Sequence, residues 1–265
     1  MKIVTSSTEL VAGCAFVPTM GALHEGHASL FRIARNINEY VVASIFVNPL
    51  QFENKDDLAK YPRTPDRDIE LAEAAGVTHL WLPNQGEIYP GEPKMLSAGP
   101  LGEIYEGASR KGHFDGVVTV VRRQFDLVNP AQAVFGEKDF QQLALVKSIA
   151  GNVEIISAPI IREIDGLAMS SRNVRLDEES RESATVISRA LTLAAKESTV
   201  ESAKKILVET LKSVEAFTID YAEIIDETNF ETATNSTARK RGIVAGWING
   251  VRLLDNMQMN SGATK

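Results

Sequence analysis

The chain is short of several features that define large classes of protein. It holds a single cysteine, Cys14, among 265 residues, which excludes an intramolecular disulfide and is typical of a reducing compartment. No apolar run approaches the roughly 18 residues that a membrane-spanning helix needs. The first residues, MKIVTSSTEL, lack the apolar core of a signal peptide. These absences predict a cytoplasmic protein with no membrane partner.

Positive charge is scarce as well. Lys and Arg number 28 against 35 Asp and Glu, a formal net charge of −7, which offers no electrostatic basis for binding nucleic acid. Neither GxGxxG after the first predicted strand nor GxxxxGK[ST] occurs, so the dinucleotide fingerprint and the Walker loop are both missing. The hydrophobic content of 44% supports an ordinary packed core. We therefore expect a globular protein that binds a small anionic molecule.

The apolar pattern predicts an α/β fold. Strand and helix patterns alternate over the first 160 or so residues, as a doubly wound, Rossmann-like parallel sheet requires. Beyond Pro159 two helical stretches precede three strands, which predicts a smaller α+β domain with a short antiparallel sheet. The expected domains are 1–163 and 164–265. Strands are predicted at 14–17, 41–47, 79–82, 133–135, 153–156, 217–226, 242–248 and 251–256, and helices from near 26 and at 66–75, 116–128, 137–151, 178–196 and 199–214; the segment 83–112 is expected to be loop or short helix.

Two of the four histidines, His24 and His27, lie three residues apart in VPTMGALHEGHASL, where a predicted strand passes into a helix. The first turn of a helix has unpaired N–H groups and the positive end of the dipole, which suit it to bind phosphate. Gly26 between the histidines lets a ligand approach the backbone. The alternative is that local polar residues cap the helix and that the histidines merely pack. Their pairing around a glycine favours an anion site.

Three further polar stretches, FVNPLQFE, FGEKDFQQL and DGLAMSSRN, follow predicted strands. Ligands of open parallel sheets bind at these carboxyl ends. Lys138 offers a point charge for phosphate and Asp139 a hard oxygen ligand for Mg²⁺. The segment 170–172, Ser-Ser-Arg, adds hydroxyl groups and a charged fork, while Gln51 and Gln142 offer amides that orient a small polar substrate. Each stretch alone would be an ordinary polar loop; together they predict a nucleotide-handling site.

These motifs give the chain a resemblance to the pantoate–β-alanine ligases, members of the nucleotidylyltransferase superfamily with the HxGH signature. VPTMGALHEGH, SIFVNPLQF, YPRT, EGASRKGHFDGVVTVV, FGEKDFQQLAL, DGLAMSSRN and RLLDN occur in the family's order over nearly the whole length. The resemblance implies a Rossmann-like domain followed by a smaller lid domain, a homodimer, and a need for ATP and Mg²⁺. It also implies condensation of pantoate with β-alanine to pantothenate, a coenzyme A precursor, through pantoyl adenylate, with release of AMP and pyrophosphate.

The resemblance also implies roles for individual residues. Gln51 is expected to contact pantoate and β-alanine, and Gln142 pantoate. The resemblance implies that His27 is a proton donor. The pantoate carboxylate is already ionised at neutral pH, so the first step needs no proton transfer. We therefore expect His24, His27 and Lys138 to stabilise charge on the phosphoryl oxygens. The ATP contacts implied are Met20, Gly21, Ala22, Leu23, His24, Glu25, Gly26, His27, Gly136, Glu137, Lys138, Asp139, Ile161, Met169, Ser170, Ser171 and Arg172.

Other activities remain as alternatives at this stage. A nucleotidyltransferase of the same superfamily would share the histidine pair but not VNPLQF together with EKDFQQL. A nucleotide-binding module without turnover would bind ATP and release no product. A tRNA ligase is disfavoured by the acidic charge and by the absence of an anticodon-sized extension. The ligase activity remains the favoured hypothesis.

Overall fold

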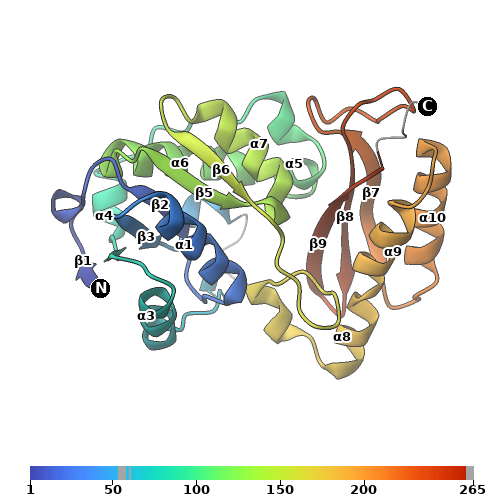
Figure 1. Ribbon diagram of the computed structural model, residues 1–265, viewed down its shortest axis with the longest axis horizontal. Helices are drawn as coiled ribbons and strands as arrows, with labels where there is room; N and C mark the ends of the chain where they lie inside the picture. Colours follow the sequence, from blue (N-terminus) through green and yellow to red (C-terminus); the bar gives the residue numbers. More distant parts are fainter. Residues whose placement is uncertain (53–57, 60, 261–265) are drawn as a thin grey trace. The chain divides into compact units, whose positions relative to one another are not determined.

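The computed structural model describes residues 1–52, 58–59 and 61–260 (Figure 1). The chain forms two compact units, Met1–Ile161 and Arg162–Lys265. The sequence places the domain boundary between residues 163 and 164. Each unit has its own sheet and its own hydrophobic core.

A six-stranded sheet in the order β1-β4-β3-β2-β5-β6 forms the centre of the first unit, and all its pairings are parallel. This arrangement confirms the predicted Rossmann-like sheet. Its strands are β1 (Lys2–Val4), β2 (Ala15–Thr19), β3 (Val41–Ile45), β4 (His79–Trp81), β5 (Gln132–Gly136) and β6 (Glu154–Ala158). The sequence analysis found five of them and missed β1. Three residues at a sheet edge, of which only Val4 is buried, leave no periodicity to detect.

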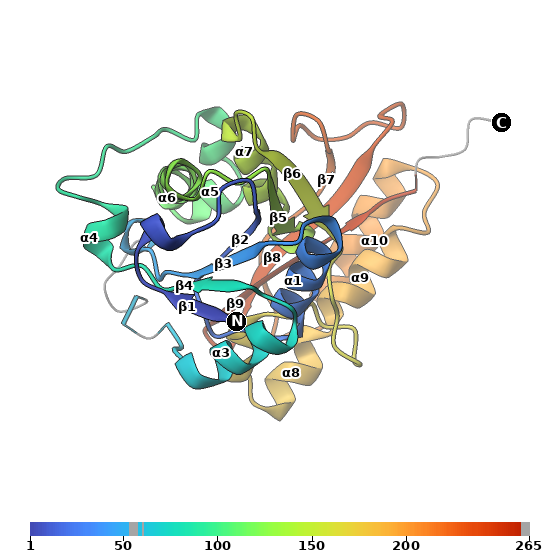
Figure 2. The ribbon, with the colours of Figure 1, turned by 60° about the vertical axis from the view of Figure 1, so that its left-hand side comes forward.

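Helices cover both faces of this sheet (Figure 2). In Figure 2, α6 and α7 lie on one side of the sheet, and α1 and α3 on the other. The helices of this unit are α1 (Glu25–Ile37), α3 (Pro65–Ala74), α4 (Gln85–Ile88), α5 (Glu106–Ser109), α6 (His113–Val128) and α7 (Phe140–Ile149), with 3₁₀ turns η1 (Ser7–Glu9), η2 (Pro49–Gln51), η3 (Pro100–Glu103) and η4 (Glu137–Asp139). Successive strand residues therefore alternate between two cores: Phe16 packs with the α6 side, while Ala15 and Val17 pack with the α1 side.

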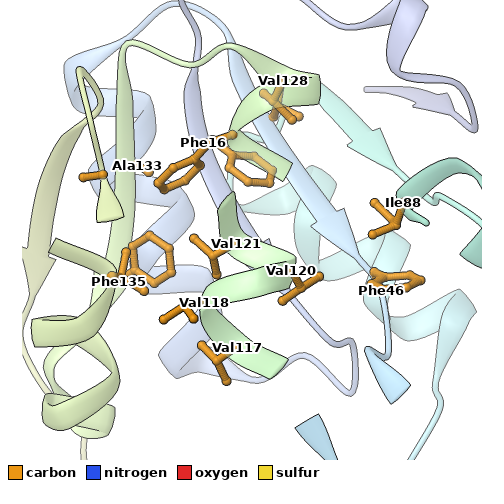
Figure 3. Close-up of a cluster of buried hydrophobic side chains, with 14 of the residues drawn as sticks. Phe16, Phe46, Ile88, Val117, Val118, Val120, Val121, Val128, Ala133 and Phe135 are labelled. Atoms are coloured by element: carbon orange, nitrogen blue, oxygen red, sulfur yellow. The ribbon is translucent and has the colours of Figure 1, made fainter. Parts of the chain in front are cut away.

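The core on the α6 side is built from large apolar side chains (Figure 3). Val117, Val118 and Val121 of α6 lie beside Phe135 of β5 in the close-up, and Phe16 of β2 lies above them. All five are less than 7% exposed. The apolar face of α6 fixes this helix against the sheet, and with it the start of the helix, which contacts the turn η2.

The second unit is a three-stranded antiparallel sheet packed on helices, as the sequence predicts (Figure 1). Leu191, Leu207 and Leu211 from the helices form a core with Ile224 and Val244 from the sheet. One predicted helix, 178–196, is divided at Thr185 into two. The elements are η5 (Ser171–Arg175), α8 (Glu178–Ala184), α9 (Val186–Ala194), α10 (Val200–Lys212), β7 (Thr218–Asp226), β8 (Lys240–Ile248) and β9 (Val251–Gln258).

The strands β2 and β5 separate at the point where the strand order of the parallel sheet reverses. β2 pairs with β5 only through Ala15 and Phe16, whereas its pairing with β3 continues to Thr19. Successive backbone N–H groups of a strand point to opposite neighbouring strands. The N–H of Ala15 donates to the carbonyl of Tyr40, just before β3, so the backbone nitrogen of Pro18, three residues on, faces β5. Its missing N–H costs no ladder bond there, because the pairing has already ended. A crevice at this point is the usual ligand site of such sheets.

Gly116 of α6 sets how closely this helix approaches η2. A Cβ atom at Gly116 would lie 2.3 Å from the carbonyl oxygen of Leu50 and 2.8 Å from the backbone nitrogen of Gln51. Asn48 Nδ2 also donates to the carbonyl of Gly116, at 3.1 Å. The position of Gln51 therefore depends on the absence of a side chain at residue 116.

We predict that Gly116→Ala lowers the free energy of unfolding by about 1–3 kcal/mol, because the backbone it meets must move. The measurement is urea unfolding followed by circular dichroism. Gly136→Ala is the control for stability, since a Cβ there would meet only Cδ2 of Leu30, at 3.9 Å, which is an ordinary van der Waals contact. Equal stability of Gly116→Ala and the wild type would contradict this packing.

Candidate active site

The loop after β2 and the turn after β5 lie close together where these two strands separate. The loop runs from Met20 into α1, and η4 carries Lys138 and Asp139. The charges of both η4 residues act on the imidazole of His27: Asp139 raises its pKa and Lys138 lowers it. The structure thus brings together residues from two of the four polar stretches.

Both histidines cap the first turn of α1. His24 is the N-cap residue, and its Nδ1 accepts from Gly26 N–H at 3.2 Å. In return Nδ1 of His27 accepts from His24 N–H at 3.3 Å. This is the geometry of a capping box, made by two imidazoles whose ring centroids are 4.1 Å apart. The backbone N–H groups of His24 and Gly26, which the sequence predicts to be open to an anion, therefore donate to the histidine rings.

The cap determines where the histidines can donate a hydrogen bond. Because each Nδ1 accepts from a backbone N–H, it carries no proton, and a neutral ring then has its proton on Nε2. His24 and His27 are thus Nε2–H donors. The sequence pattern did not predict that the histidines themselves cap the helix. This capping role is compatible with anion binding, because it uses Nδ1 and leaves Nε2 to donate.

His27 is held in its neutral form. Its burial, which removes water from the ring, lowers its pKa from the ordinary value of 6.5 to about 3, and the neighbouring His24 acts in the same direction. The unfolded chain therefore takes up a proton near pH 6.5 that the folded chain resists. The corresponding stability is complete above that pH and is lost as the pH falls toward 3.

A buried carboxylate shapes the loop before the histidines. Asp68 of α3 is 2% exposed. It accepts from the N–H groups of Ala22 and Leu23 at 2.9 and 2.7 Å, and from the hydroxyl of Thr64 at 2.8 Å. The loop needs this support because Gly21 and Ala22 both have a positive φ, 86° and 50°. The amides of Ala22 and Leu23 are thereby used within the protein.

Lys138 and Asp139 differ in exposure. The Lys138 side chain is 18% exposed and the Asp139 side chain 50%, with Nζ and Oδ1 3.8 Å apart. The Lys138 side chain is therefore mostly covered by its surroundings, whereas the Asp139 carboxylate is half open to solvent. Within the part of the chain that the structure describes, no group of three or more His, Cys, Asp or Glu side chains is placed to hold a metal ion.

Gln51 lies in η2 and is held by several neighbours. Its Oε1 accepts from Asn48 Nδ2 at 3.1 Å, and its Nε2 lies 2.9 Å from Sδ of Met20. Its backbone carbonyl lies 2.9 Å from Nδ1 of His113, the first residue of α6. Since a carbonyl only accepts, Nδ1 of His113 is the donor. The contact with Met20 links Gln51 to the histidine loop.

The two adjacent glutamines of α7 have different surroundings. Gln141 is buried and bonds to the backbone of Leu101, Ile104 and Glu106, so it orders the loop before α5. Gln142, the predicted substrate contact, is only partly buried. A substrate can therefore reach Gln142 more readily than Gln141.

The remaining predicted ATP contacts lie at the end of the first unit and in the second. Ile161 is the last residue of the first unit, and residues 169–172 belong to the second. There Ser170 caps η5 by accepting from Arg172 N–H at 3.2 Å. Gly136 ends β5, and Glu137 begins η4. Their assignment to ATP stays a prediction.

Three residues that shape this site were missed at the level of sequence: Asp68, Asn48 and His113. Asp68 stands in PDRDIEL, where it resembles any acidic residue in the first turns of a helix. The quoted motifs contained Asn48 and His113, but only their neighbours were assigned roles. A helical wheel would have placed Asp68 on the same face as buried Ala72, four residues on, and a charge on an apolar face is a signal of a specific partner.

Comparison with known proteins gives one consistent family. The model of the pantoate–β-alanine ligase family matches residues 2–258. The pantothenate synthetase of Acidothermus cellulolyticus is 47% identical over 94% of this chain and 86% of its own length. That of Thermus thermophilus is 43% identical over 98% of this chain and 99% of its own length.

Solved structures agree. The crystal structure of pantothenate synthetase from Thermus thermophilus has a TM-score of 0.92 at 42% identity, covering 97% of this chain and 99% of that one. The pantoate–β-alanine ligase of Francisella tularensis, in a complex with beta-gamma ATP and β-alanine, has a TM-score of 0.77 at 33% identity, covering 97% of each chain.

We predict that the imidazole of His27 stays neutral, with its proton on Nε2, from about pH 8 down to about pH 5, since its pKa is about 3. Nitrogen-15 NMR of the histidine rings distinguishes the two tautomers and the imidazolium. His27→Gln identifies the signal by its disappearance. Titration of His27 near pH 6.5 would show that the ring is solvated and that the cap is open.

We also predict that Asp68→Asn destabilises the loop before α1, because an amide has one acceptor oxygen for two backbone N–H groups. A buried donor without a partner costs about 1–3 kcal/mol. Hydrogen exchange should show reduced protection of the amides of Ala22 and Leu23. Asp66→Asn, at an exposed position of the same helix, should leave both amides protected. Unchanged exchange in Asp68→Asn would remove Asp68 from its supporting role.

Proposed function

The chain belongs to the pantoate–β-alanine ligase family, and we propose that it condenses pantoate with β-alanine through an enzyme-bound pantoyl adenylate. In the first step a pantoate carboxylate oxygen attacks the α-phosphorus of ATP, and pyrophosphate leaves. In the second step the β-alanine amine attacks the acyl carbon, and AMP leaves. The products are pantothenate, AMP and pyrophosphate.

The observation that carries this proposal is the pair of capped histidines beside η4. Because Nδ1 of each ring accepts from a backbone N–H, Nε2 of each ring is the donor at the head of α1, and Lys138 adds a positive charge from the neighbouring strand end. Donors held in place before the reaction stabilise developing charge without a cost of reorganisation. Such a set suits attack at phosphorus, where charge spreads over the phosphoryl oxygens.

We propose that His27 acts as a hydrogen-bond donor and not as an acid. With a pKa of about 3 the imidazolium is rare at neutral pH, so it is a poor source of a proton. The pantoate carboxylate is ionised at that pH and needs no base. The first step then consists of positioning and charge stabilisation, with no proton transfer to assign.

The substrates are proposed to be oriented by the two partly or fully buried amides. Asn48 holds Oε1 of Gln51 and Nε2 of Gln51 donates to Sδ of Met20, which leaves the second N–H of this amide to donate to a carboxylate or hydroxyl oxygen of pantoate or β-alanine. Gln142 is proposed to contact pantoate. Because amides carry no charge, they add orientation and contribute little to phosphate affinity.

Mg²⁺ is proposed to enter with ATP. The Asp139 carboxylate supports this, since Mg²⁺ at nucleotide sites is held by one or two carboxylates together with phosphate oxygens and water. The half-exposed carboxylate of Asp139 fits such a role, and a cage made only of protein ligands is not required. When bound, the ion neutralises charge on the phosphates. Lys138 does the same from the protein side.

The second unit is proposed to act as a lid. Residues 169–172 offer hydroxyl groups and a guanidinium, which suit phosphate oxygens. A lid that excludes water would protect the mixed anhydride from hydrolysis.

We further propose a homodimer in the cytoplasm. The buried free thiol of Cys14 is consistent with a reducing compartment, as its burial raises its pKa to about 12 and keeps it unreactive. None of the described helices is long and apolar enough to cross a membrane.

The proposal predicts a complete first half-reaction without β-alanine. ATP, Mg²⁺ and pantoate should give one equivalent of pyrophosphate and enzyme-bound pantoyl adenylate, measured by rapid quench and mass spectrometry. β-alanine should then release AMP and pantothenate. Release of ADP and phosphate would indicate an acyl phosphate and overturn the adenylate. No product with any nucleotide would favour a binding module.

Variants assign the donors within this same experiment. Lys138→Ala should slow the first half-reaction by about 10²-fold or more, as expected for loss of one preorganised donor. Lys147→Ala, at an exposed position of α7, is the matched control. His27→Ala should slow the first half-reaction much more than the attack of β-alanine on supplied pantoyl adenylate. Equal damage to both steps would overturn only the role given to His27.

A further inference from the structure

A short hairpin leads into residues 169–172 of the second unit. Arg162 and Ala168 form an antiparallel bridge, Glu163 N–H donates to Leu167 at 2.8 Å, and Gly166 N–H donates to Glu163 at 2.8 Å. Arg162 forms two hydrogen bonds to the carboxylate of Asp255 on β9, at 2.6 and 3.0 Å. The hairpin is therefore fixed to the sheet of its own unit, and Met169 directly follows its last bridged residue, Ala168.

The two oxygens of Glu163 have different partners. Oε2 accepts from Arg181 of α8 at 2.5 Å, and Oε1 accepts from Nδ2 of Asn173 at 2.8 Å. Asn173 is 6% exposed, and its Nδ2 also donates to the carbonyl of Ala168 at 3.1 Å. Ala168 directly precedes the segment 169–172, and Asn173 directly follows it. This one amide thus ties both ends of the segment together.

The Asn173 amide is held for its two donor contacts. Its Oδ1 is buried and has no hydrogen-bond partner among the residues that the structure describes. A buried acceptor without a partner costs free energy. Only the two hydrogen bonds donated by Nδ2 can therefore favour this orientation of the Asn173 amide. Glu163 therefore fixes the direction in which the amide points, and without it Nδ2 loses one of its two partners.

We propose that Glu163 is a positioning residue for the nucleotide, acting through Asn173 on the segment 169–172. The proposal rests on the proposed function, in which this segment binds ATP. With Glu163 present the segment is held in its binding shape before ATP arrives. Without it only a fraction of molecules has that shape, and the apparent affinity for ATP falls by the same fraction.

Asp165 provides a matched comparison within the same hairpin. Its carboxylate also pairs with Arg181, with Oδ2 2.8 Å from the guanidinium. The other oxygen of Asp165, Oδ1, accepts from Leu167 N–H at 3.0 Å. The corresponding oxygen of Glu163, Oε1, accepts from Asn173 instead. Asp165→Asn removes an ion pair with Arg181 and keeps the turn. Glu163→Gln also removes an ion pair with Arg181, but its amide oxygen can still accept from Asn173. Glu163→Ala removes both contacts.

The test is the steady-state rate of pyrophosphate release by full-length protein with saturating pantoate, Mg²⁺ and β-alanine, and varied ATP. We expect Glu163→Ala and Asn173→Ala each to raise the KM for ATP about tenfold, with kcat changed much less, since they lower the competent fraction. Glu163→Gln and Asp165→Asn should stay within about twofold of the wild type, because the contact with Asn173 survives in both. The double variant Glu163→Ala, Asn173→Ala should be no worse than Asn173→Ala alone, because Glu163 acts through Asn173.

Each other outcome has a definite meaning. Equal effects of Glu163→Ala and Asp165→Asn would overturn the proposal and leave only a stabilising ion pair with Arg181. Additive effects in the double variant would also overturn it, since two residues of one path cannot add. If Glu163→Ala does not fold, Asn173→Ala decides alone, because it leaves the Glu163–Arg181 pair intact. A wild type that releases no pyrophosphate refutes the proposed function and this inference with it; an active wild type with indifferent variants refutes only the inference.

Discussion

The two hydrogen bonds with which the rings of His24 and His27 cap α1 are the contacts on which the candidate active site depends. They occupy each Nδ1 and leave each Nε2 as the donor, so one small motif determines the helix start, both tautomers and the direction of both donors. The low pKa of His27 belongs to the same arrangement, because a protonated Nδ1 could no longer accept from His24 N–H. An imidazolium at this position would therefore break the cap. Neutrality is a structural requirement here as well as a chemical one.

The place of this motif follows from the sheet. β2 separates from β5 after Phe16, and Pro18 lies where a ladder N–H is no longer needed. The chain beyond Pro18 then has to turn sharply into α1 through Gly21 and Ala22, both at positive φ. Strain of this kind persists only when neighbouring groups hold the backbone in place. Asp68 does so with two backbone hydrogen bonds, which explains a buried carboxylate on a helix that otherwise packs through small apolar residues.

The sequence predicts those features that depend on neighbouring residues. The strands β2 to β6 and the helices α1, α3 and α6 follow from their apolar residues, and the motif order identifies the family. It did not reveal β1, which is too short for a pattern, nor the break at Thr185, because Ser, Ala and Thr around it are all tolerated in helices. Asp68, Glu163 and Asn173 escaped for another reason. Apart from Thr64 beside Asp68, their partners are 5 to 46 residues away along the chain, and no local pattern encodes such contacts.

Both proposed nucleotide segments are held by a carboxylate from outside the segment, and the chemistry of anion binding explains why. A loop that presents donors to phosphate cannot bury them in its own core, so it gains little stability from packing. Its shape must come from acceptors placed behind it. Asp68 takes the amides of Ala22 and Leu23, and Glu163 takes Nδ2 of Asn173. A carboxylate so close to a phosphate would repel it if it were free, but here each negative charge is already engaged by N–H donors on the protein side. Such carboxylates can therefore preorganise an anion site without opposing the anion.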